Sequence, residues 1–99
     1  MDKNIREMLN YSGGGILSKE IVRGGSLDVT LFCMAGGTEI SEHTSTKEGF
    51  VYVIEGKGTF MLNVKKIHMA PGTFIHMGRN AVHSLKAEEN TSFMLALFR

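Results

Sequence analysis

From residue 16 onward, apolar and polar residues alternate with a period of two, in short segments separated by turn residues. This alternation is typical of strands that bury one face, and short strands at regular spacing are typical of an all-β sandwich or barrel. Asn63 to Lys66 and Pro71-Gly72 have the composition of tight turns. The pattern predicts strands at 16–23, 26–35, 38–43, 50–55, 58–63, 65–70, 73–77, 82–87 and 91–98.

The alternation also predicts which side chains face the interior. In the segment 26–35 the odd positions, Leu27 to Cys33, are apolar and alternate with Asp28 and Thr30, so we expect the odd positions to face inward. The segments 50–55 and 91–98 differ because they are apolar on both faces. A strand buried on both faces needs a cover on its outer side. We therefore expect the N-terminal segment or a second subunit to cover it, and the sequence favours a homodimer.

The first residues lack the strand pattern. Ile5, Met8 and Leu9 have helical spacing, which predicts either a short helix over 2–10 capped by Asp2 or a loose arm packed on the barrel or on a neighbour. Three consecutive glycines at 13–15 end the segment, because glycine is unfavourable inside a helix or strand. We expect one domain over 1–99, with an arm at 1–15 and a barrel at 16–99.

Composition excludes several classes of protein. The chain is 42% apolar with a formal charge of +1, and its acidic and basic residues are interspersed. This balance argues against a nucleic-acid surface and against a polybasic membrane anchor. Cys33 is the only cysteine, so no intrachain disulfide can form, which fits a reducing compartment. No apolar run is long enough for a signal peptide or a membrane span, and we expect a cytoplasmic protein.

Two stretches contain histidines in similar settings. Gly37 and His43 precede the segment Val53 to Gly56, and Pro71-Gly72 precedes a short strand and then His83. In this order and separation the two stretches resemble the paired motifs of small single-domain cupins, a family of jelly-roll β-barrels. The resemblance covers about residues 26–98, and it implies that both histidines point into the mouth of one barrel.

The resemblance also implies a metal site, with departures from the family's set of three histidines and one glutamate. Of the family's four ligand positions, only two are matched here, by His43 and His83. Ser45 stands at the second histidine position and Gly49 at the glutamate position. Glu48 would supply a third ligand if a bulge turned it inward. Imidazole ligands suit Zn²⁺, Ni²⁺, Fe²⁺ or Cu²⁺. The alternative is two neutral histidines that hydrogen-bond through water in a polar pocket, and the sequence leaves both open.

Two further side chains are candidates for the pocket. Tyr52 would donate a hydroxyl if it points inward and would belong to an interface if it points outward. Arg79, in the loop before His83, would hold an anionic ligand or remain a solvated loop residue. The candidate ligand pocket thus consists of His43, Ser45, Tyr52, Arg79 and His83.

Three functions are compatible with these observations. The first is a barrel that binds or senses a small molecule. The second is a metal-dependent oxygenase, isomerase or lyase with His43 and His83 as ligands and with Glu48 or Tyr52 as acid–base groups. The third is a non-catalytic scaffold or interaction barrel. The reduced ligand set favours the first function, and whether the protein is an enzyme stays open.

Overall fold

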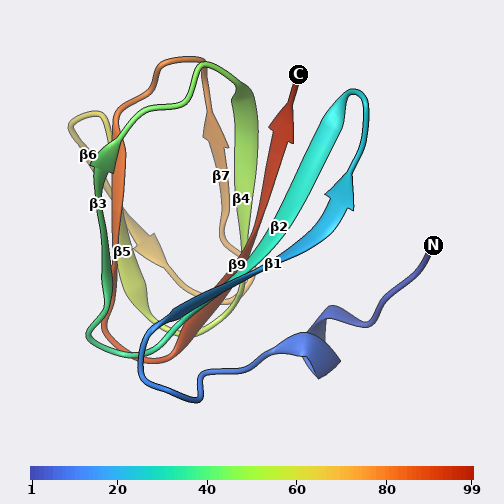
Figure 1. Ribbon diagram of the computed structural model, residues 1–99. Helices are drawn as coiled ribbons and strands as arrows, with labels where there is room; N and C mark the ends of the chain where they lie inside the picture. The colour runs from blue at the N-terminus through green and yellow to red at the C-terminus, as the bar shows by residue number, and fades with distance from the viewer.

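A computed structural model describes residues 1–99, and apart from one short 3₁₀ turn every regular element is a strand. Two antiparallel sheets face each other, one in the order β1-β2-β9-β4-β7 and the other in the order β3-β8-β5-β6 (Figure 1). This jelly-roll barrel confirms the predicted fold class. The strands are β1 (Ile16–Arg23), β2 (Leu27–Met34), β3 (Glu39–His43), β4 (Glu48–Glu55), β5 (Gly58–Leu62), β6 (Lys65–Met69), β7 (Phe74–Met77), β8 (His83–Ala87) and β9 (Thr91–Phe98).

The core lies between the two sheets. Residues directly opposite each other in neighbouring antiparallel strands share one face of the sheet. Phe93 of β9 is opposite Phe32 of β2 and Val53 of β4, and these side chains face the interior. Phe32 and Phe93 stack with ring centroids 5.0 Å apart. The buried core residues are Met34, Val51, Val53, Phe60, Met69, Ile75, Met77, Leu85, Ala87 and Phe93.

The predicted orientation of β2 is wrong. Leu31 and Cys33 are opposite Met94 and Ser92, and they lie on the outer face of the five-stranded sheet, whereas Phe32 lies on the inner face. Leu31 and Cys33 are nevertheless buried. Near its end, β2 is apolar on both faces, so alternation alone does not identify the inner one.

The N-terminal segment covers part of this outer face. It runs outside the barrel beside β1, and Lys19 Nζ donates to the carbonyl oxygen of Met8 at 2.9 Å (Figure 1). The Tyr11 hydroxyl donates to Glu55 Oε2 at 2.9 Å. Burial, together with this carboxylate, raises the pKa of Tyr11 to about 12. The arm that packs on the barrel is therefore the correct interpretation of residues 1–12.

The alternative interpretation, a helix capped by Asp2, is wrong. Only Ile5–Met8 forms a 3₁₀ turn, and its cap is Asn4, whose side chain accepts from the Glu7 amide. Isolated helices of this length are marginal, since nucleation fixes several residues for each hydrogen bond gained. The structure has no helix with the length and hydropathy needed to cross a bilayer.

Candidate functional site

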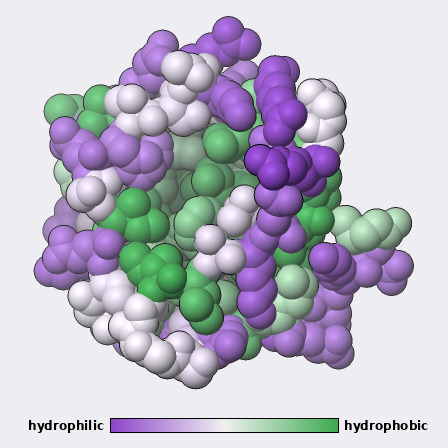
Figure 2. Space-filling view, viewed as in Figure 1, coloured by the Kyte–Doolittle hydropathy of each residue, from purple (hydrophilic) through white to green (hydrophobic).

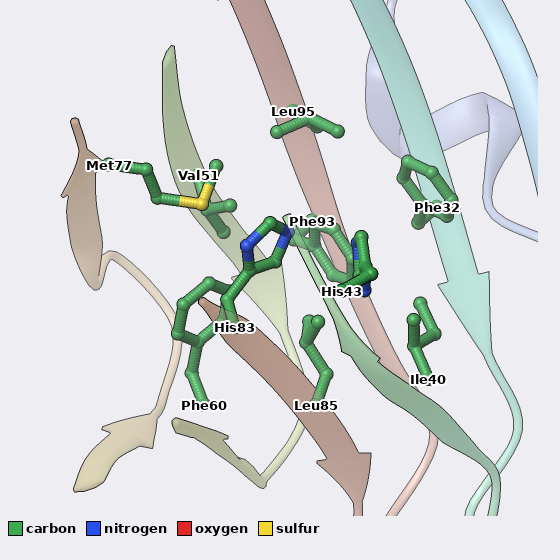
Figure 3. A pocket seen from close by; sticks show the side chains of 10 residues that line it. All are labelled: Phe32, Ile40, His43, Val51, Phe60, Met77, His83, Leu85, Phe93 and Leu95. Atoms are coloured by element: carbon green, nitrogen blue, oxygen red, sulfur yellow. The ribbon is translucent and has the colours of Figure 1, made fainter. Parts of the chain in front are cut away.

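Two histidines lie side by side on the inner face of the four-stranded sheet. His43, at the end of β3, pairs directly with His83, at the start of β8. Their ring centroids are 4.0 Å apart, and the ring planes are tilted by 59° (Figure 3). Because β3 is an edge strand, His43 is exposed, whereas His83 lies between β3 and β5 and is only 7% exposed.

A β-bulge brings His43 to this face. Ile40 pairs with Leu85 and His43 pairs with His83, so β3 has one more residue between the two pairs than β8. A bulge of this kind re-aims the side chains that follow it. In a regular strand, residues three positions apart such as Ile40 and His43 point to opposite faces, whereas here both line the same pocket. The sequence pattern gave no sign of this bulge.

The histidines form the polar part of an otherwise apolar pocket. Figure 2 shows the corresponding hollow, lined by apolar residues and rimmed largely by polar ones. The walls surround about 280 Å³ when the open mouth is counted, of which about 40 Å³ admits the centres of water molecules. That free space corresponds to roughly three waters. The lining residues are Phe32, Ile40, His43, Val51, Phe60, Met77, His83, Leu85, Phe93 and Leu95.

Backbone hydrogen bonds fix the tautomer of both rings. His43 Nδ1 lies 2.8 Å from the carbonyl oxygen of Ser41, and His83 Nδ1 lies 3.1 Å from that of Ala81. A carbonyl oxygen only accepts, so each Nδ1 carries the proton and donates. In the neutral ring each Nε2 is then a bare acceptor. Neither Nε2 has a hydrogen-bond partner in the protein.

The environment of His83 favours its neutral form. Burial lowers the pKa of His83, and the neighbouring His43 lowers it further, while the bond to the Ala81 carbonyl opposes this shift. The ring of Phe60 also lies parallel to His83, with centroids 5.9 Å apart and planes within 1°. His83 is therefore an uncharged hydrogen-bonding group at neutral pH.

This lowered pKa makes stability depend on pH. An unfolded histidine titrates near pH 6.5, so below that pH the unfolded chain binds a proton that folded His83 resists. The free energy of unfolding should fall as pH drops from about 6.5 towards the pKa of folded His83. We expect the fall to be smaller in His83→Phe, measured by urea denaturation between about pH 7.5 and pH 5. The other three histidines are the same in both proteins, and equal pH dependence would contradict the expectation.

Three of the predicted pocket residues lie elsewhere. Ser45 belongs to the loop after β3, where its Oγ accepts from the Lys47 amide at 3.1 Å. Tyr52 lies on the outer face and is 43% exposed, because Val51 and Val53 take the inward positions of β4. Arg79 is exposed in its loop and does not line the pocket.

The prediction that Glu48 could turn inward as a third ligand is also wrong. Its carboxylate lies on the outer face, with Oε2 2.6 Å from Nε2 of His76. The pairing of β4 with β9 is regular from Glu48 to Val53, so no bulge turns Glu48 inward. Gly49 holds the neighbouring inward position. A Cβ there would collide with the backbone oxygen of Ala96 and approach Leu97 Cδ2 at 2.8 Å. The backbone at position 49 therefore leaves no room for a side chain.

The donor set does not fit a metal centre built from protein ligands alone. No group of three or more His, Cys, Asp or Glu side chains in the structure is placed to hold a metal ion. Zinc sites use three or four protein ligands, and the pocket supplies two imidazole nitrogens.

The fold and pocket identify the class of protein. The cupin domain family matches residues 30–98, so the chain belongs to the cupin family and the sequence resemblance is confirmed. A search of curated proteins finds no match.

Solved structures show the same fold. The chain is similar to a conserved protein of unknown function from Streptococcus pyogenes, with 22% identity, a TM-score of 0.89 and coverage of 100% of this chain and 87% of the other. It is similar to a Cupin 2 conserved barrel domain protein from Leptotrichia buccalis, with 26% identity, a TM-score of 0.90 and coverage of 98% and 47%. A salicylate 1,2-dioxygenase variant from Pseudoaminobacter salicylatoxidans has 19% identity, a TM-score of 0.78 and coverage of 87% and 27%.

Proposed function

We propose that this cupin binds a small, largely apolar organic molecule in the pocket between its sheets. The observation that carries the proposal is an open pocket in which eight of ten lining residues are hydrophobic and two are histidines. Small-molecule sites are typically concave, mostly apolar and marked by a few polar groups that orient the ligand. This arrangement supports binding more strongly than a scaffold role, since a scaffold needs no open pocket.

A fragment screen by NMR tests the proposal. We expect at least one fragment to cause saturable shifts in the amide signals of β4, β8 and β9, which line the pocket. Ile40→Trp, on the edge strand β3, should fill the mouth and weaken binding about tenfold or more, since the ligand loses apolar contact area. His68→Trp, on an exposed position of β6, is the matched control and should bind as the wild type. Absence of saturable binding, or shifts confined to the outer surface, would contradict the proposal.

A metal-dependent enzyme is the weaker candidate. With His43 and His83 alone, Zn²⁺, Ni²⁺, Fe²⁺ or Cu²⁺ would need at least one more ligand from a bound substrate. Relatives with the same fold include a dioxygenase, but a likeness at 19% identity supports the fold and not the reaction.

We further propose that two copies of the chain associate through the outer face of the five-stranded sheet. Phe50 of β4 lies against Phe74 and Phe98, with ring centroids 5.0 Å and 6.1 Å away. Phe74 is 59% exposed, Phe98 is 45% exposed, and Tyr52 lies on the same face. We call these four residues the aromatic patch. Contiguous exposed apolar patches mark interaction sites.

The other outer face supports the choice of this one. On the four-stranded sheet the outward positions include His68, Lys66 and Lys86, which are exposed and polar. The aromatic patch is therefore the exposed aromatic cluster on these two faces; the other exposed apolar residues include Ile16 and Leu17 of β1 and Val64 between β5 and β6. A second copy is the proposed occupant, because in a two-fold dimer the same patch on each copy covers the patch on the other.

The remaining expectations stay predictions. The single unpaired cysteine, Cys33, supports the cytoplasm as the location. The interspersed charges support the absence of nucleic-acid and membrane partners. The division into an arm at 1–15 and a barrel at 16–99 agrees with the position of β1.

A further inference from the structure

The pocket presents hydrogen-bond acceptors without any donor. Each histidine has its Nδ1 proton committed to a backbone carbonyl, which leaves Nε2 of His43 and of His83 as lone-pair acceptors. The other eight lining side chains are hydrophobic and carry no N–H or O–H group. A ligand that enters the pocket therefore meets acceptors only.

The two acceptors are not equivalent. His43 is exposed at the mouth, where water can donate to its Nε2, whereas His83 is 7% exposed and packed between Phe60 and His43. Figure 3 shows the His83 ring surrounded by apolar side chains. A ligand that fills the pocket excludes water from Nε2 of His83. A buried acceptor left without a donor is unfavourable, so the ligand itself must supply the donor.

We propose that the ligand of this pocket is a neutral molecule with an apolar body and a hydroxyl or N–H group that donates to Nε2 of His83. The proposal rests on the proposed binding function and specifies the chemistry of the ligand. The apolar body lies against Val51, Phe93 and Leu95, and the donor group lies at the His43–His83 pair.

The same geometry disfavours anions. A carboxylate brings only acceptors, and these would face the lone pairs of two neutral imidazoles. The lowered pKa of His83 works in the same direction, because it keeps the ring uncharged. No lysine or arginine lines the pocket to compensate. The preference for a ligand that donates a hydrogen bond thus follows from the hydrogen bonds to the Ser41 and Ala81 carbonyl oxygens, which hold the ring protons on Nδ1 and leave Nε2 as the acceptor.

Three probes of similar size test this selectivity: phenol, anisole and benzoate, titrated above neutral pH in the presence of a chelator. Phenol has the donor, anisole has the same ring with the hydroxyl methylated, and benzoate is an anion. We expect phenol to bind about tenfold more tightly than anisole, because a site with an acceptor rejects a ligand that leaves it unpaired. Benzoate should bind more weakly than phenol. The readout is the dissociation constant from NMR shifts of pocket amides.

The variant His83→Phe then tests whether Nε2 of His83 is the atom that accepts the ligand's hydrogen bond. Phenylalanine keeps a ring against Phe60 and removes Nε2, so the phenol-to-anisole preference should fall to about one. His68→Phe, on the exposed face of β6, should keep the wild-type preference. If His83→Phe fails to fold, the ratio of phenol to anisole binding by the wild-type protein still tests the proposal.

The outcomes separate this proposal from the one it rests on. Equal binding of phenol and anisole by the wild type, or tighter binding of benzoate, overturns the donor proposal and leaves pocket binding intact. A phenol preference that requires added Zn²⁺ also overturns it, because the hydroxyl would then bind the metal. Failure of all three probes and of the fragment screen overturns both.

Discussion

Gly49→Ala is expected to destabilise the protein by about 3 kcal/mol, a large effect for the addition of one methyl group. The new Cβ would collide with the backbone oxygen of Ala96 and meet Leu97 Cδ2 at 2.8 Å. Because the nearest atom belongs to the backbone of β9, relief requires β4 and β9 to separate where they pair. Urea denaturation measures the change, and for a domain of this size the melting temperature should fall by about 15 °C.

Gly78→Ala is the matched control. A Cβ at Gly78 has no atom within 4 Å, and its φ is not positive, so its free energy of unfolding should change by less than about 0.5 kcal/mol. If the Gly49 variant were as stable as this control, the close approach of the two strands would be wrong.

The same contact explains why one substitution cannot restore the family's metal ligand. Gly49 stands where the resemblance places a glutamate, and Gly49→Glu would bring the same backbone collision before its carboxylate reached the histidines. The missing ligand therefore reflects the spacing of β4 and β9 as well as the residue type. Gly49→Glu alone would add a third ligand only if β4 and β9 moved apart.

Phe74→Arg is expected to raise the dissociation constant of the proposed dimer about 100-fold. Phe74 is the most exposed member of the aromatic patch, at 59%. In a two-fold interface each substitution acts twice, placing unpaired charges among apolar rings. Sedimentation velocity over a range of micromolar concentrations should show a dimer for the wild type and a monomer for the variant.

His68→Arg provides the comparison for this experiment. It adds a guanidinium to the polar outer face of the other sheet, and the dimer should persist. A wild-type protein that stays monomeric throughout the range would refute the dimer, and a dimer unaffected by Phe74→Arg would place the interface elsewhere.

The alternation of apolar and polar residues predicted the strands and the all-β class, and the resemblance to cupins supplied the jelly-roll barrel. Each strand was located to within a few residues, and in β8 His83 points inward as predicted, on the same face as Leu85 and Ala87. Alternation failed in β2, where Phe32 and Leu31 are both apolar and only the pairing with β9 shows which one faces the interior.

The candidate site was harder to predict, because its composition depends on where strands end and bulge. Tyr52 and Glu48 share one side of β4, so a single register determines that both point outward. Ser45 lies beyond the end of β3, where strand alternation no longer applies. The place of Phe60 beside His83 depends on the pairing of β5 with β8, which the sequence pattern does not specify.

Because the bulge absorbs the extra residue between Ile40 and His43, two lengths of β3 are compatible with the same pairing of the two imidazoles. Deleting Ser41 or Glu42 would leave a step of two residues, the regular strand spacing, so the histidine should still pair with His83 without the bulge. Loop grafts and alignments of related barrels should therefore count residues in this stretch before comparing side chains, since a histidine two positions along a regular strand and one three positions along a bulged strand face the same partner.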